Sequence, residues 1–139
     1  MLPFVCGVLM AFPLACGKKA PPFLPEKQMA ARVDQLTGVY ADGEVQLTGR
    51  IVNSSEGPEP TGCRVYQGWY PLDDPPCEGC PIQLAVLSGT QKIVISENRL
   101  VCAIPQANRE GIGFFQVRLT DESGAEGPPS ERIRLKIKD

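Results

Sequence analysis

From about residue 29 onward, apolar and polar residues alternate in short runs that Gly, Pro, Asn and Asp separate. In residues 44–52 the side chains of Val45, Leu47 and Ile51 fall on one face, and the polar side chains fall on the other. A period of two is that of a β-strand with one buried face. The same pattern recurs in two later rows, Phe115, Val117, Leu119 and Ile133, Leu135, Ile137. No stretch of useful length has the period of an amphipathic helix, so the sequence predicts an all-β fold.

Further strands are predicted by similar runs at residues 32–40, 63–70, 82–87, 92–95 and 99–104. Seven or eight strands in about 110 residues, separated by turns, are typical of an immunoglobulin-like β-sandwich. The 14 Gly and 14 Pro among 139 residues agree with a fold rich in loops and turns. We therefore expect one β-sandwich over residues 29–139.

Two segments resemble the fibronectin type III family. Residues 115–130, FQVRLTDESGAEGPPS, are similar to the end of such a domain, where an aromatic-x-Val strand leads to D-x-x-G and then to G-P-x-S. Residues 62–66, GCRVY, are similar to the family's third strand, often G-Y-x-V-Y. The resemblance implies a fibronectin type III-like sandwich. The chain departs from the family at Gly49, near the usual core tryptophan, and at Phe115, where a corner tyrosine is usual. Trp69 is expected to fill some of the missing volume.

Residues 1–15, MLPFVCGVLMAFPLA, form an uncharged apolar run that is too short to cross a membrane as a helix of ~20 residues. The run ends at Ala15-Cys16-Gly17, and a proline-rich stretch that begins with Lys18 and Lys19 follows. These residues resemble a bacterial lipoprotein signal, in which the cysteine receives diacylglycerol and becomes the first residue after cleavage. The resemblance implies a signal peptide over residues 1–15, lipidation at Cys16 and a tether over residues 16–28.

Such a lipid would hold the protein in a leaflet without a transmembrane helix, since each buried methylene contributes about 0.8 kcal/mol. By the family's sorting habit, Gly17 fits export to the outer membrane, which leaves the domain in the periplasm or at the cell surface. The opening C-G-K-K-A-P-P also resembles a short lipoprotein family that assists the lipopolysaccharide translocon, with C-G-x-K-G-P at its mature N-terminus. That resemblance implies an alternative role as an assembly factor for an outer-membrane machine. A generic extended tether is the simpler interpretation.

Four cysteines remain once Cys6 in the signal and Cys16 under the lipid are set aside. An even number in an exported domain predicts disulfides, with three connectivities open. We favour Cys63 with Cys102, because each continues an inward-facing row, and Cys77 with Cys80 inside one loop. The first bridge would close ~40 residues and contribute about 3–4 kcal/mol by chain-entropy theory. The alternative joins Cys63 to Cys77 and Cys80 to Cys102.

The segment Cys77-Glu78-Gly79-Cys80 lies between two prolines and permits other chemistry. A structural zinc site usually has two such C-x-x-C pairs, and a redox-active pair usually begins a helix. Covalent haem needs a histidine where this chain has Pro81. The neighbouring pair of acids at residues 73–74 lacks the spaced ligands of a calcium loop, so an Asp-Pro turn is favoured. We expect no metal and no cofactor.

The chain has no histidine and a formal net charge of −2. It therefore lacks the usual general base and every Ser-His-Asp or Cys-His arrangement, and we expect no enzyme. A thiol-disulfide role of the C-x-x-C loop stays open as an alternative. No basic block is longer than two residues, which argues against nucleic-acid binding.

We instead expect a protein partner in the cell envelope, contacted by the aromatic loop that runs from Trp69 to Cys80. Its contact residues would be Trp69, Tyr70 and Tyr66, although packing in the core or at an edge is the competing interpretation. The basic row at positions 132, 134, 136 and 138 is expected to be a solvated strand face that discourages edge pairing.

Overall fold

The computed structural model describes residues 28–88, 91–105 and 110–138. These residues form strands and connecting loops, with no helix. The strands are β1 (Arg32–Ala41), β2 (Glu44–Val52), β3 (Gly62–Tyr70), β4 (Ala85–Val86), β5 (Lys92–Ser96), β6 (Arg99–Pro105), β7 (Gly111–Thr120), β8 (Glu126–Pro129) and β9 (Ile133–Ile137).

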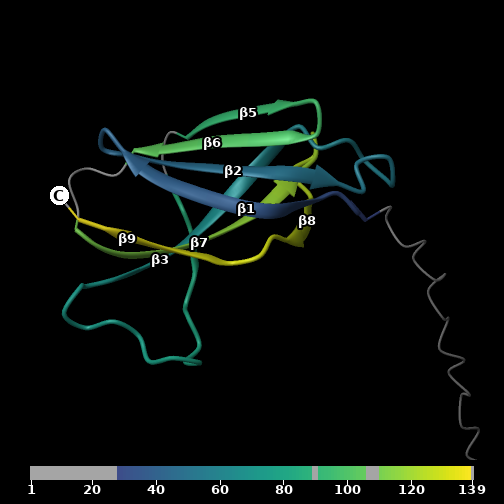
Figure 1. Cartoon of the computed structure of the whole chain (residues 1–139). Helices are drawn as coiled ribbons and strands as arrows, with labels where there is room; N and C mark the ends of the chain where they lie inside the picture. Colours follow the sequence, from purple (N-terminus) through teal and green to yellow (C-terminus); the bar gives the residue numbers. More distant parts are fainter. Residues whose placement is uncertain (1–27, 89–90, 106–109, 139) are drawn as a thin grey trace, which may run out of the picture.

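The strands form two antiparallel sheets that pack face to face (Figure 1). One sheet has the order β1-β2-β6-β5; the other has the order β4-β3-β7-β8, with β9 also paired to β7. This is the A-B-E-D and C-F-G order of a constant-type immunoglobulin sandwich, with β4 as an added edge strand. We call the two sheets the ABED sheet and the CFG sheet. The all-β sandwich prediction is confirmed.

The core lies between the sheets and follows the predicted alternation. Val45, Leu47 and Ile51 are buried on β2, and the row from Phe115 to Leu119 is buried on β7. On β9, Ile137 is buried, whereas the other two members of its row are half-buried and pack against the core. Both of those side chains lie against Gly38 of β1, where a Cβ would come within 2.9 Å of each.

A bulge in β1 explains how the sandwich forms without a tryptophan on its second strand. The pairing of β1 with β2 shifts between Asp34 and Thr37, and Gln35 adopts a φ of 53°. The extra residue lets Val33 and Leu36 both point inward, although their spacing is odd. Both cover Gly49 of β2, where a Cβ would collide with Val33 Cγ1. Two side chains from β1 therefore fill the space beside Gly49.

The last strand is divided into β8 and β9, and β8 ends at two prolines. Pro128 and Pro129 have no N–H to donate to a ladder. Ser130, which follows them, is buried and replaces the missing pairing with its own groups. Its backbone N–H donates to the Val117 carbonyl at 2.8 Å, and its hydroxyl accepts from the Val117 N–H at 2.9 Å.

The strand predicted over residues 82–87 begins too early, since pairing with β3 starts at Ala85 and ends where the Leu87 N–H donates to the Val65 carbonyl at 2.8 Å. The three residues before Ala85 cross the face of β3 instead of running along its edge. The carbonyl oxygen of Gln83 lies 2.7 Å from the position of a Cβ on Gly68 of β3. Backbone that lies over a strand in this way cannot donate to its ladder, so β4 begins only at residue 85.

Candidate functional site

The CFG sheet carries buried aromatic and aliphatic side chains on its outer face, the face turned away from the ABED sheet. Because Phe115 points into the core, Ile112 and Phe114 point outward. Both are nevertheless buried, with 2% and 8% of their surface exposed, and neither belongs to the main core cluster. A second layer must therefore cover this part of the sheet.

The cover is the connection between β3 and β4, residues 71–84, which we call the disulfide loop. In Figure 1 it extends from the CFG sheet on the side away from the ABED sheet. It returns over Gly68, which pairs with Phe114 across the ladder. A Cβ on Gly68 would lie 3.3 Å from side-chain atoms of both Ile82 and Leu84. The glycine thus provides the close approach that brings the loop onto the sheet.

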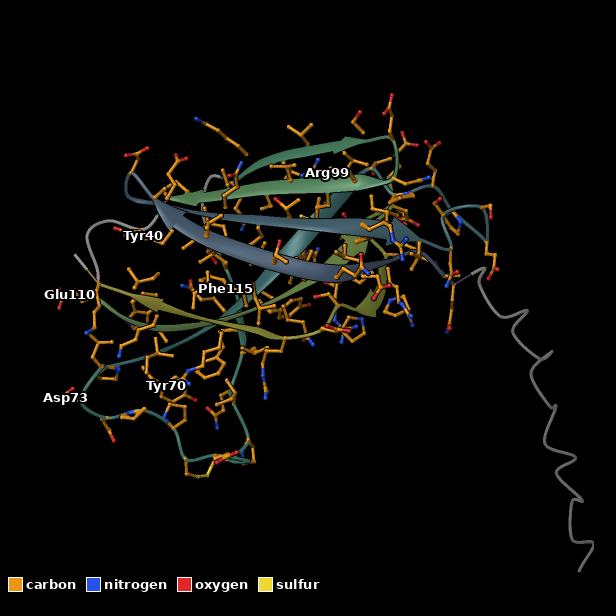
Figure 2. All side chains as sticks on the ribbon, viewed as in Figure 1. Tyr40, Tyr70, Asp73, Arg99, Glu110 and Phe115 are labelled. Atoms are coloured by element: carbon orange, nitrogen blue, oxygen red, sulfur yellow. A yellow bond between two sulfur atoms is a disulfide. The ribbon has the colours of Figure 1, made fainter. Side chains whose placement is uncertain are left out.

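Tyr70 is the last residue of β3, at the point where the strand leads into the disulfide loop (Figure 2). Its ring meets the ring of Phe114 edge to face, with centroids 5.7 Å apart. Such a pair contributes about 0.5–1.5 kcal/mol beyond its burial. The aromatic pair therefore fixes the beginning of the disulfide loop against the outer face.

Cys77 and Cys80 form a disulfide at the exposed end of the loop, with Cα atoms 5.3 Å apart. The Cys80 N–H donates to the Cys77 carbonyl at 3.1 Å, and Gly79 has a φ of 78°. This is the left-handed conformation that the third residue of a type II turn needs. The predicted pairing of Cys77 with Cys80 is confirmed. The alternative, which joins Cys63 to Cys77 and Cys80 to Cys102, is not seen. The pair lies in a turn, so no helix dipole acts on its sulfurs.

A groove of about 390 Å³ separates the disulfide loop from β9. The loop side consists of residues 76–80 and Ile82. The strand side consists of Phe114, Arg132 and Arg134. The guanidinium carbon of Arg132 lies 5.8 Å from the centroid of the Phe114 ring, within the range of a cation–π contact.

The three aromatic residues predicted as one contact surface lie in different surroundings. Trp69 shares the inward face of β3, packs against the core and covers Gly111 and Gly113 of β7. It fills core volume, as expected from the absence of the second-strand tryptophan. Tyr66 and Tyr70 share the outer face, but four residues of strand, about 13 Å, separate them. Tyr70 contacts Phe114, which lines the groove.

Tyr66 instead belongs to a polar cluster at the other end of the outer face. Its hydroxyl donates to Glu126 Oε2 at 2.7 Å, and Arg64 Nη1 donates to Glu126 Oε1 at 2.7 Å. Arg118 Nε lies 3.9 Å from the same carboxylate. The hydrogen bond from Tyr66, followed by the one from Arg64, lowers the pKa of Glu126. The same contact raises the pKa of Tyr66.

Cys63 of β3 and Cys102 of β6 meet across the core from opposite sheets. Both are buried free thiols. The hydrogen bond to Cys102, together with burial, raises the pKa of Cys63, and the same bond lowers the pKa of Cys102. Cys102 Sγ also lies 4.0 Å from the side-chain oxygen of Gln91. The structure brings the predicted partners together, and their oxidation to a disulfide stays a prediction.

Sequence reasoning missed the outer-face cluster and the groove. The row Arg132–Lys138 was expected only as a solvated face, yet its first two members line the groove with Phe114. A signal was present in Gly111-Ile112-Gly113-Phe114-Phe115, which is apolar at successive positions instead of alternating. A strand with that pattern is buried on both faces.

Cys16, the predicted signal peptide and nearly all of the predicted tether lie outside the described residues, so the lipidation prediction is untested. Within the described ranges no group of three or more His, Cys, Asp or Glu side chains is placed to bind a metal. The same residues include no helix with the length and apolar character of a membrane span.

No protein-family model, curated protein or solved structure matches this chain at a significant level.

Proposed function

We propose that this protein is a non-catalytic lipoprotein, anchored to the outer membrane through Cys16, whose sandwich binds another component of the cell envelope. The observation that carries the binding role is the disulfide loop, which is held over the outer face of the CFG sheet and leaves a groove beside it. Binding residues are often found on loops that a rigid scaffold positions.

The loop is ordered before any partner arrives. The disulfide closes its tip, the Tyr70–Phe114 pair holds its start, and its return rests on Gly68. An ordered loop loses less conformational entropy on association than a flexible one, so more of the contact energy is available for affinity. The exposed disulfide also agrees with export, since such bonds persist in oxidising compartments.

The anchor is tested by labelling cells with radioactive palmitate. We expect the wild-type chain to incorporate label and fractionate with the outer membrane, and we expect Cys16→Ala to do neither. Two acyl chains or more are needed for stable anchoring, so loss of the acceptor thiol should release the protein. An unlabelled wild-type chain would contradict the anchor.

The binding role is tested by crosslinking in intact cells. A photoreactive residue replaces Glu78 at the tip of the loop or, as the matched control, Val39 on β1 in the ABED sheet. Val39 has 61% of its surface exposed and belongs to the other sheet, outside the residues that line the groove. We expect a discrete adduct with an envelope protein from position 78 and none from position 39. Equal adducts from both positions would contradict a specific contact at the loop.

A further inference from the structure

The two arginines of the groove differ from the other two arginines on the same sheet face. Arg64 and Arg118 both interact with Glu126. Arg132 and Arg134 are exposed, and neither takes part in any ion pair found among the described residues. The two cations at one end of the outer face thus share a carboxylate, whereas the two beside the groove pair with none among the described residues.

The spacing of these arginines indicates which kind of anionic ligand they would bind. Arg132 and Arg134 are two residues apart along an extended segment and both point to the outer face, so their Cα atoms are about 6.7 Å apart. Alternate side chains of an extended peptide have the same repeat. Carboxylates form strong, paired hydrogen bonds with guanidinium groups, which fixes their position as well as their charge.

The opposite wall of the groove sets the polarity of the ligand. It is formed by Pro76, the disulfide and Ile82, with Glu78 as its charged residue. A carboxylate on that side would be repelled by Glu78, and an apolar side chain would bury surface against Pro76 and Ile82. A ligand that fits both walls therefore has acidic side chains on the face toward the strand and apolar side chains on the face toward the loop.

We propose that the groove binds an extended segment of a partner protein in which acidic and apolar residues alternate. The acidic side chains would pair with Arg132 and Arg134, and the apolar ones would face the disulfide loop. This inference rests on the proposed binding function and names the chemistry of its partner. The groove volume of about 390 Å³ lies within the range of small-molecule pockets, so it would hold only a short part of that segment.

The test measures binding of fluorescent peptides to the purified full chain by anisotropy. One peptide alternates glutamate and valine, a second has the same composition with the glutamates in one block, and a third replaces every glutamate by lysine. The protein is wild type, the groove variant R132Q/R134Q, or the control K136Q/K138Q. The control removes two charges from the same row, outside the residues that line the groove.

We expect the alternating peptide to bind wild type, and the groove variant to bind it at least about tenfold more weakly. The control should change the affinity by less than about twofold, since neither lysine lines the groove and exposed charges contribute little. Equal binding of the block peptide, equal losses in both variants, or no binding by wild type would each overturn the proposal. None of these results depends on the lipid anchor or on the crosslinking at position 78, so the two proposals fail separately.

Discussion

The two faces of the CFG sheet are buried by different means. The inner face meets another sheet, and its row of Phe115, Val117 and Leu119 has no exposed surface. The outer face has no second sheet; one loop, held by a disulfide and by a close approach to Gly68, covers Phe114. The inner face therefore carries the stability of the fold. The outer face is a local structure that can change without unfolding the sandwich.

The largest expected effect on stability comes from comparing substitutions at Phe115 and Phe114, which point to opposite faces. Phe115→Ala should lower the free energy of unfolding by about 3–5 kcal/mol, because it leaves a cavity between two packed sheets. Phe114→Ala should cost about 1–2 kcal/mol, because the loop can settle onto the sheet and part of its cover is solvent-exposed. Urea denaturation of both variants measures the difference. Equal losses would show that the outer cluster belongs to the same cooperative core.

The inter-sheet thiols give the next largest effect. We expect Cys63 and Cys102 to be oxidised in an exported protein, since both thiols are buried in the same core cluster between the sheets. A bridge that closes ~40 residues should raise the free energy of unfolding by about 3–4 kcal/mol over the reduced state. Intact mass with and without reductant, followed by urea denaturation in the C77S/C80S background, measures this. A mass that shows both thiols free in protein isolated from cells would contradict it.

Much of the fold was readable from the sequence because sheet-on-sheet burial leaves a period of two. The row in β2 and the row in β7 are both buried as predicted. The bulge at Gln35 was not predictable, because it depends on which residues of β1 must face Gly49. The alternation within one strand gives no information on such a contact between β1 and β2.

The candidate site was predicted only in part, for a related reason. The Cys77–Cys80 pairing is local and could be inferred from spacing. The groove depends on where a loop of 14 residues returns, and that is decided by Gly68 and Phe114 on two different strands. Trp69 and Tyr70 are adjacent in the sequence, yet they lie on opposite faces of β3 and serve different clusters.

A substitution at Gly68 should displace the disulfide loop without disturbing the core. A methyl group there would meet the Gln83 carbonyl at 2.7 Å, so Gly68→Ala should push the return of the loop away from β3. We expect faster proteolysis within residues 71–84 and a loss of about 1–2 kcal/mol in global stability. Gly62→Ala is the matched control on the same strand and face, where the added methyl meets only the Thr120 hydroxyl. Similar cleavage of both variants would contradict the role assigned to Gly68.

The smallest expected effect comes from the polar cluster on the outer face. Because its hydrogen bonds lower the pKa of Glu126 in the folded protein, the cluster stabilises the fold above the ordinary carboxyl pKa. That contribution is lost as the pH falls through the lowered value. The raised pKa of Tyr66 acts in the alkaline range, with stabilisation that is lost as the pH rises through the folded value.

Glu126→Gln should therefore flatten the loss of stability between about pH 7 and pH 3, by about 1 kcal/mol at neutral pH after allowance for solvent screening. Tyr66→Phe, which keeps the ring and removes the hydroxyl that most lowers the pKa of Glu126, should produce part of the same change. Urea midpoints measured across this range check both variants. If Glu126→Gln followed the wild-type pH profile, ionisation of Glu126 would not be linked to folding, and the cluster would not account for any loss of stability in acid.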